Sequence, residues 1–329
     1  MIISKTPYRI SFFGGGSDYP AWYKKYGGEV LSTTIDKYIY ISCRFSPKYF
    51  DKKYRIVWRK IENVQTAKEI NHKAVRELLK YLKIKPGLEI HYYGDLPARS
   101  GMGSSSCFTV GLMQSLYRIK KIELNKLKLA KKSIYFEQKV MKEIVGSQDQ
   151  TSASFGGFNK IIFNRNGSIR VKKISSNKNI NKLNDNLTLI YTGINRTAHK
   201  IANNYVNKLT KEKSKHIQRI TSYVREGENI LKSGKIDDFG ILLNEAWMEK
   251  KALSNLITNS KINEIYDQAI KHGALGGKLL GAGGGGFLLM YMKEKDRKFF
   301  FKKFKKLVNI PFNFTKTGSE IIFDEITNK

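Results

Sequence analysis

Apolar side chains in the first part of the chain gather into segments rich in β-branched and aromatic residues. These segments cover 2–13, 30–45 and 54–59 and are bounded by turn residues, so we predict three strands. Between 66 and 83 the apolar residues instead recur every four positions, which predicts a helix with one buried stripe. The first part of the chain therefore mixes strands with helices.

The middle of the chain carries both kinds of pattern. Apolar spacing predicts one helix over 107–119 and another that ends near Gly146. The pair Asn166-Gly167 lies between two apolar runs and is typical of a tight hairpin turn. The stretch 175–186 is almost wholly Ser, Asn, Lys and Asp, and we predict that it links two domains.

The second half begins with a predicted strand over 187–191, which is followed by a largely helical region. A glycine cluster over 273–286 leads into another predicted strand over 287–291, and a basic helix and a short strand end the chain. We therefore predict an α+β fold with two domains, residues 1–180 and 181–329.

The composition is typical of a globular protein in a reducing compartment. The chain has 329 residues, of which 41% are hydrophobic, and this content is enough for two cores. Its two cysteines, Cys43 and Cys107, cannot build a disulfide framework. We find neither a signal peptide nor an apolar run of membrane-spanning length, so we expect a cytoplasmic protein with no membrane partner.

The chain is strongly basic, with 60 Lys and Arg against 28 Asp and Glu and a formal net charge of +32. Such an excess suits nucleic acid, an anionic surface or a phosphorylated substrate. The basic residues are mostly scattered lysines, and the densest run, 295–306, also carries four phenylalanines, as an amphipathic helix does. We therefore predict a lysine-rich surface, no nucleic-acid partner and compatibility with a multiply anionic substrate.

A glycine- and serine-rich loop separates a predicted strand from the helix over 107–119. It reads Pro97-Ala98-Arg99-Ser100-Gly101-Met102-Gly103-Ser104-Ser105-Ser106. Free amides at a helix N-terminus bind anions, and glycines let phosphate oxygens approach the main chain. The loop lacks the lysine of a Walker motif, and Ser106 stands where a dinucleotide-binding loop needs its third glycine. A nucleotide phosphate site of another type and a serine-capped helix start are both open on this segment alone.

Three further segments carry candidate chemistry. The first runs over 7–19 and places three glycines before Asp18, a carboxylate suited to accept sugar hydroxyls. The second is a polar turn that contains Asp149, twelve residues after Glu137. The third has four consecutive glycines before a strand, over 278–286. Three glycine-rich loops and three carboxylates together favour a ligand site over ordinary turns.

These segments resemble the three motifs of the GHMP kinases, the superfamily of galactokinase, homoserine kinase, mevalonate kinase and phosphomevalonate kinase. The motifs occur in family order and span nearly the whole chain. Within the superfamily they resemble the branch of heptose 7-phosphate kinases and fucokinase domains, with Met102 and Ser17 as conservative departures from Leu and Thr. The resemblance implies an N-terminal domain like ribosomal protein S5 domain 2 and a ferredoxin-like C-terminal domain.

The resemblance also implies roles for individual residues. The catalytic residues would be Asp149, which takes the proton of the attacking hydroxyl or orients it, and Arg9, which stabilises the transferring phosphoryl group. ATP would be bound by Pro97, Ser100, Gly101, Met102, Gly103, Ser104, Ser105 and Ser106. Ser105 and Glu137 would hold Mg²⁺, a hard cation that suits a hydroxyl and a carboxylate.

The acceptor implied by the resemblance is a sugar. It would be bound by Gly15, Gly16, Ser17, Asp18, Arg196, Gly283, Gly284 and Gly285. We predict an ATP-dependent kinase for the anomeric hydroxyl of D-glycero-D-manno-heptose 7-phosphate, which yields the 1,7-bisphosphate for nucleotide-activated heptose and surface polysaccharide. The alternatives are the same reaction on another sugar such as L-fucose, or a non-catalytic ligand-sensing relative. No oligomeric state is predicted.

Overall fold

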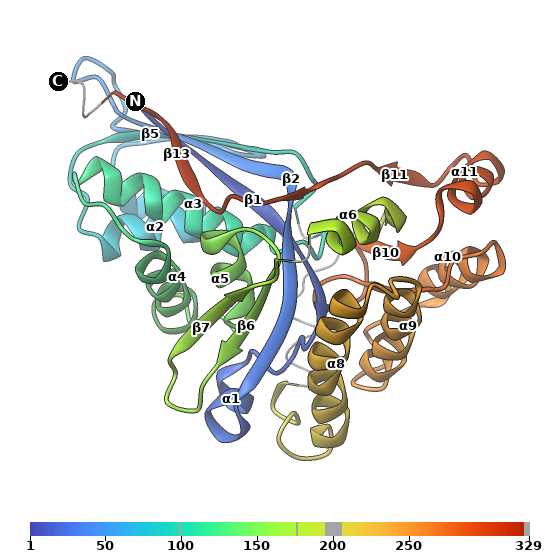
Figure 1. Cartoon of the computed structure of the whole chain (residues 1–329). Coiled ribbons are helices and arrows are strands. Elements are labelled where there is room, and N and C mark those ends of the chain that lie inside the picture. Colours follow the sequence, from blue (N-terminus) through green and yellow to red (C-terminus); the bar gives the residue numbers. More distant parts are fainter. Residues whose placement is uncertain (99, 176, 195–205, 326–329) are drawn as a thin grey trace.

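A computed structural model describes residues 1–98, 100–175, 177–194 and 206–325, which form two sheets flanked by helices (Figure 1). The larger sheet has the order β13-β1-β2-β5-β3-β4, with β6 and β12 also paired to β2 and β7 paired to β6. Its strands are β1 (Ile2–Phe13), β2 (Gly28–Phe45), β3 (Tyr54–Val57), β4 (Ile61–Val64), β5 (Leu88–Gly94), β6 (Asn159–Phe163), β7 (Ile169–Lys173), β12 (Phe314–Thr315) and β13 (Glu320–Asp324).

Most helices of the N-terminal half lie on one face of this sheet, and the first helix lies at its end (Figure 1). The helical elements of this half are α1 (Pro20–Tyr26), the 3₁₀ turn η1 (Ala67–Glu69), α2 (Lys73–Tyr81), α3 (Ser104–Ile119), α4 (Lys126–Tyr135), the π-helical turn η2 (Phe136–Val140) and α5 (Gln148–Phe155). Helix α3 packs on β1 and β2 and is buried along most of its length, since α4 and α5 lie against its other side. A helix in such a central position needs apolar residues on nearly all of its faces, and the sequence of α3 provides them.

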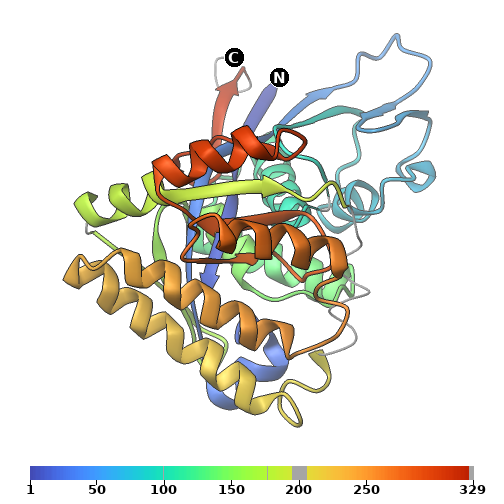
Figure 2. The same ribbon diagram turned by 90° about the vertical axis from the view of Figure 1, so that its right-hand side faces the viewer.

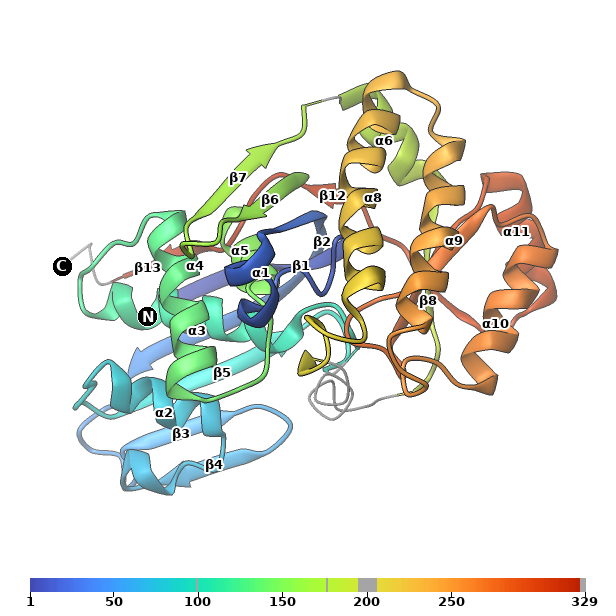
Figure 3. The same cartoon turned by 90° about the horizontal axis from the view of Figure 1, so that it is seen from below.

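The smaller sheet is antiparallel, with the order β11-β8-β10-β9. Its strands and the helices of the second half are β8 (Leu187–Tyr191), β9 (Gly276–Leu279), β10 (Phe287–Tyr291), β11 (Val308–Ile310), α6 (Asn177–Asn186), α8 (Ser214–Ser233), α9 (Asp237–Lys251), α10 (Ser260–Lys271) and α11 (Glu294–Lys303). Helices α8 and α9 lie side by side (Figures 2 and 3), and α8 also packs on β1 and β2 of the larger sheet. The second half thus covers the face of β1 that α3 leaves open.

The end of the chain returns to the larger sheet. Strand β13 pairs antiparallel with β1, where Ile2 lies opposite Asp324, and β12 pairs with β2. The N-terminus and the end of β13 accordingly lie close together (Figure 1). The predicted second range, 181–329, therefore contributes two strands to the sheet of the first.

Most predicted elements occur. Residues 177–186, which lie within the segment 175–186 predicted to link two domains, form helix α6. Its two apolar residues, Ile180 and Leu183, are three positions apart and both are buried in the core, so a short amphipathic helix forms in spite of the polar composition. The glycine cluster before β10 also contains strand β9, which the sequence analysis did not separate from the loop.

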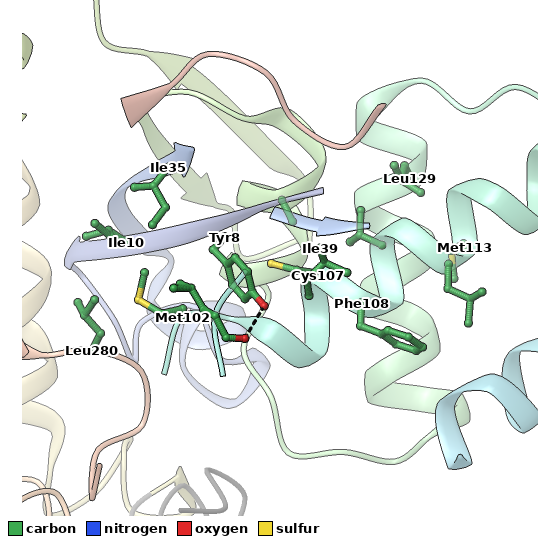
Figure 4. Packing of buried hydrophobic residues seen from close by; sticks show 14 of the residues in the cluster. Tyr8, Ile10, Ile35, Ile39, Met102, Cys107, Phe108, Met113, Leu129 and Leu280 are labelled. Carbon is green, nitrogen blue, oxygen red and sulfur yellow. Dashed lines mark hydrogen bonds between the residues drawn. The ribbon is translucent and has the colours of Figure 1, made fainter. Parts of the chain in front are cut away.

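The main core runs through both halves of the molecule. It contains residues of β1, α3, α8 and α9 in a single cluster. Met102 of the serine-rich loop is fully buried in this cluster, which also holds Tyr8 and Leu280, and Tyr8 donates a hydrogen bond to the Leu96 carbonyl (Figure 4). The side chain of Met102 therefore anchors its loop to the core. Within the described ranges, no helix combines the length and apolar character that a membrane crossing requires.

Candidate active site

Two of the predicted glycine-rich loops meet at a backbone contact. A side chain on Gly281 would lie 2.5 Å from the Cα atom of Gly101, and one on Gly286 would lie 2.1 Å from the Ser100 carbonyl oxygen. The Phe287 amide donates to that same Ser100 carbonyl over 3.2 Å. Glycine is required at these positions because the two main chains touch. The loop before α3 and the loop before β10 thus form one surface, although 180 positions of sequence separate Gly101 from Gly281.

The loop before α3 offers unpaired donors at the start of a long helix. Gly101 and Gly103 have φ of +81° and +76°, which glycine adopts without strain. Among the described residues, the backbone amides of Gly101, Met102, Gly103 and Ser105 donate to no acceptor. Amides of this kind, together with the helix dipole of α3, favour a bound anion. Of the remaining predicted ATP ligands, Pro97 is exposed and Ser100 is buried.

Arg9 and Asp149 form a bidentate ion pair beside this loop. Arg9 Nε donates to Asp149 Oδ1 over 2.7 Å, and Nη2 donates to Oδ2 over 2.8 Å. The remaining arm of the guanidinium, Nη1, donates to the Gly101 carbonyl over 2.8 Å. Burial lowers the pKa of Arg9, but the charge of Asp149 and its hydrogen bonds outweigh this effect and raise it above its ordinary value. The arginine is therefore a fixed cation between the carboxylate and the loop.

Gly103 brings the loop against the ion pair. A side chain there would lie 3.2 Å from Asp149 Oδ2 and 3.3 Å from Arg9 Cγ. The side chain of Asp149 keeps 26% of its surface exposed, whereas that of Arg9 keeps only 4%. The carboxylate thus remains accessible beside the free amides of the loop, while the arginine is enclosed behind it.

Two polar residues that the sequence analysis missed hold Asp149 in place. Ser11 Oγ donates to Gln148 Oε1 over 2.7 Å, and Gln148 Nε2 lies 3.4 Å from Asp149 Oδ1. Ser11 follows Arg9 by two positions on β1, so both side chains reach toward the start of α5. Their spacing on a strand was the one signal that could have indicated this role.

Asp18 is buried and accepts backbone hydrogen bonds. Its Oδ1 accepts from the Gly16 amide over 3.0 Å, and its Oδ2 accepts from the Gln148 amide over 3.2 Å. Gly146 packs so closely that a side chain there would overlap Asp18 Oδ2. Burial, followed by the negative charge of Asp149, raises the pKa of Asp18 to about 6, and the backbone hydrogen bonds reduce this shift. Asp18 and Asp149 therefore belong to one electrostatic unit.

Glu137 lies in the π-helical turn η2 and is 2% exposed. Its Oε2 accepts a hydrogen bond from Ser106 Oγ over 2.8 Å and another from Gln150 Nε2. Its Oε1 is buried with no hydrogen-bond partner among the described residues. Burial raises the pKa of Glu137 to about 7. The structure pairs this carboxylate with Ser106, while Ser105, the predicted partner in metal binding, has an exposed side chain.

The other predicted sugar ligands lie in two places. Ser17 is fully buried, and its hydroxyl donates to the carbonyls of Gly14 and Glu29, so it stabilises the turn before Asp18. Gly283 and Gly285 pack against the backbone of Ile257 and Ile194. Arg196 lies outside the described residues. Gly15, Gly16 and Gly284 complete these two turns.

Comparison with known proteins points to one family. The family model described as the GHMP kinases N terminal domain matches residues 68–157, and the one described as GHMP kinases C terminal matches residues 228–309. Among curated proteins, the D-glycero-alpha-D-manno-heptose 7-phosphate kinase of Campylobacter jejuni is 29% identical over 96% of this chain and 97% of its own length. The bifunctional fucokinase/GDP-fucose pyrophosphorylase of Arabidopsis thaliana is 25% identical over 89% of this chain and 30% of its own length.

Solved structures show the same architecture. A D-glycero-D-manno-heptose 1-phosphate kinase from Bacteroides thetaiotaomicron superposes with a TM-score of 0.79 at 22% identity, covering 98% of this chain and 99% of that one. The galactokinase of Lactococcus lactis superposes with a TM-score of 0.72 at 16% identity, covering 97% of this chain and 94% of that one. These likenesses confirm the predicted two-domain α+β fold.

Proposed function

The chain belongs to the GHMP kinases, and on that premise we propose that it phosphorylates the anomeric hydroxyl of D-glycero-D-manno-heptose 7-phosphate. The coarser part of this assignment is established by the family: the protein is a sugar kinase that uses ATP as phosphoryl donor. The product would be the 1,7-bisphosphate, an intermediate toward nucleotide-activated heptose for surface polysaccharide. The similarity to a heptose 7-phosphate kinase over nearly the whole of both chains supports this choice of acceptor.

The observation that carries the proposed chemistry is the contact of Arg9 and Asp149 with the loop before α3. We place the ATP phosphates on the free amides of that loop, with Asp149 beside them. Asp149 would accept or orient the proton of the attacking hydroxyl, and Arg9 would stabilise the negative charge that develops on the transferring group. Phosphoryl transfer requires mainly positioning and electrostatic stabilisation, which a rigid ion pair supplies.

Asp18 would hold the sugar. Two of its lone pairs accept hydrogen bonds from backbone amides. The remaining lone pairs can accept hydrogen bonds from sugar hydroxyls when the carboxylate is ionised. Burial, followed by the negative charge of the neighbouring Asp149, raises the pKa of Asp18, and the two carboxylates would contact the same small molecule from neighbouring positions.

The residues around Glu137 fit a magnesium ion. A buried carboxylate oxygen without a hydrogen-bond partner among the described residues, on the side chain that contacts the Ser106 hydroxyl, is a donor that suits a hard cation. We propose that Glu137 and Ser105 hold Mg²⁺, which supplies positive charge to the phosphates when bound. Ser106 would orient Glu137 through the hydrogen bond to its other oxygen.

The second candidate is the same reaction on an unphosphorylated sugar such as L-fucose, and similarity to fucokinases favours it. A panel of sugars and sugar phosphates, assayed by ADP release, distinguishes the two. We expect the highest kcat/KM with D-glycero-D-manno-heptose 7-phosphate. Activity confined to unphosphorylated sugars would contradict the heptose phosphate assignment, and no turnover with any sugar would favour a non-catalytic relative.

A further inference from the structure

Lys250, the residue before the last one of α9, holds the glycine-rich loop before β10 from behind. Its Nζ donates to the Leu279 carbonyl over 2.7 Å and to the Gly281 carbonyl over 2.6 Å. Leu279 is the last residue of β9, and Gly281 is the residue that touches Gly101 of the phosphate loop. One ammonium group therefore fixes the loop at its contact with the other loop.

This arrangement leaves some backbone amides of the loop free. The carbonyls of Leu279 and Gly281 are occupied by Lys250, and Gly281 has φ of +70°. Among the described residues, no acceptor takes a hydrogen bond from the amides of Ala282, Gly283 or Gly285. Successive free amides on a glycine loop form an anion-binding concavity once their carbonyls are turned away.

Among the described residues, the two lysines behind the loop have no counter-ion. Lys278 lies close to Lys250, is 6% exposed and donates to the Phe12 carbonyl over 2.5 Å. Within the described part of the chain, neither lysine has a carboxylate oxygen within 4 Å. Desolvation, with the nearby charges of Lys278 and Arg9, lowers the pKa of Lys250 well below its ordinary value, and desolvation and Arg9 lower that of Lys278 to about 7. A bound polyanion would relieve this repulsion.

We propose that Lys250 is a positioning residue for ATP: it holds the loop 280–286 against the loop 100–103 and adds positive potential at the place where the triphosphate binds. The inference rests on the proposed location of the ATP phosphates and goes beyond the three family motifs, since Lys250 belongs to none of them. Lys278 stabilises the same junction from the side of β1.

The test is the binding of a non-hydrolysable ATP analogue with Mg²⁺, measured by calorimetry on the full chain. Lys250→Met keeps the length of the side chain and removes the charge and the donors, so we expect affinity to fall about 10- to 100-fold, as for lost charge-assisted hydrogen bonds. The KM for ATP should rise by a similar factor, with little change in the KM for the sugar. Lys251→Met is the matched control: this neighbour also lies over the Trp247 ring, and its side chain makes no hydrogen bond to a described residue.

A second variant separates positioning from folding. Lys250→Arg keeps a cation with several donors, and we expect it to retain affinity within about fivefold of the unmodified protein. Equal affinity of the Lys250→Met and unmodified proteins would overturn the inference, and so would an equal loss in the Met and Arg variants. Absence of analogue binding by the unmodified protein would instead contradict the proposed ATP site itself.

Discussion

Asp149 is the residue on which the proposed chemistry depends most. Both of its oxygens accept hydrogen bonds from Arg9, whose third arm reaches the phosphate loop, and Gln148 supports the same carboxylate. The carboxylate cannot turn away from the loop without breaking this ion pair. Its position is therefore set before any substrate binds, which is the form of preorganisation that phosphoryl transfer uses.

Replacement of Asp149 should separate catalysis from nucleotide binding. We expect Asp149→Asn to lower kcat by about 10²- to 10⁴-fold, the usual contribution of a general base, while the affinity for an ATP analogue changes little. Steady-state kinetics and calorimetry measure the two effects. Asp267→Asn, an exposed acid on α10, is the control and should leave both unchanged. Unchanged turnover in Asp149→Asn would contradict the assigned role.

Asp18 should make sugar binding dependent on pH. With a pKa of about 6, it is ionised at pH 7.5 and about nine-tenths protonated at pH 5, so it loses its capacity to accept sugar hydroxyls as the pH falls. We expect the KM for the sugar to rise about tenfold over this interval. The Asp18→Asn variant should bind the sugar more weakly. Its KM should still respond to the ionisation of the substrate phosphate, but it should lack the additional rise in KM that protonation of Asp18 causes. Identical pH profiles in the two proteins would contradict this role.

The raised pKa of Asp18 affects folding stability in the opposite direction: it weakens sugar binding at low pH but favours the folded state there. Because the folded protein holds a proton on Asp18 up to about pH 6 and the unfolded chain releases it near pH 4, this group favours the folded state at low pH. That contribution is lost as the pH rises through 6. Asp18 is thus held in an ionised state at neutral pH at a cost in stability, which is common for groups retained for function.

Single residues of the site were predictable to different degrees. The sequence motifs alone indicate four of them, Arg9, Asp18, Glu137 and Asp149, because these residues lie in or near distinctive glycine-rich or polar segments. The pairing of Glu137 with Ser106, and the support of Asp149 by Gln148 and Ser11, depend on how α5 and η2 pack against the phosphate loop. Lys250 lies in an ordinary amphipathic helix, so no local pattern distinguishes it from Lys251.

At the scale of elements, the two glycine loops act as one unit because their main chains touch. A substitution at this contact should damage both. We expect Gly281→Ala to destabilise the protein and to abolish binding of an ATP analogue, since the added methyl group would lie 2.5 Å from the Gly101 Cα atom at φ of +70°. Thermal unfolding and calorimetry report the two losses.

Gly167→Ala is the matched control for this change. Gly167 has φ of +81°, but a side chain there meets nothing within 4 Å. It therefore carries only the backbone cost of a left-handed conformation, about 1–2 kcal/mol, and should leave analogue binding intact. Equal effects of the two substitutions would show that the contact between the loops has no special importance.

The elements also show where sequence patterns are sufficient. Strand β1 and helix α3 were predicted within a few residues because each has a long apolar signal. Helix α6 was missed because only Ile180 and Leu183 reveal its buried face. The pairing of β13 with β1 connects the two ends of the chain, and no local pattern indicates such a long-range contact.

At the scale of the whole molecule, the net charge of +32 should accelerate the capture of anionic substrates. Long-range attraction is screened beyond about 8 Å at physiological ionic strength. We therefore expect kcat/KM for ATP to fall several-fold between about 0.01 and 0.15 M salt, with kcat nearly constant. A neutral sugar acceptor at saturating ATP is the control, and its kcat/KM should change little. Salt-independent capture of ATP would contradict this role of the surface charge.

The second half of the molecule packs against the half that carries the loop before α3. Helix α8 packs on β1 and β2, α9 brings Lys250 to the second glycine loop, and the core runs through both halves without a break. The chemistry proposed for Asp149 is possible because residues from both halves converge on one strand, β1. This convergence is a property of the fold and could be anticipated only through the family resemblance.

The most direct test of the central claim is phosphorus NMR of the product formed from ATP and D-glycero-D-manno-heptose 7-phosphate. We expect a sugar bisphosphate in which one phosphorus is coupled to the anomeric proton, and we expect Asp149→Asn to form it about 10²- to 10⁴-fold more slowly than the unmodified enzyme. A new phosphate on any other hydroxyl, or release of inorganic phosphate without a phosphorylated sugar, would contradict the central claim.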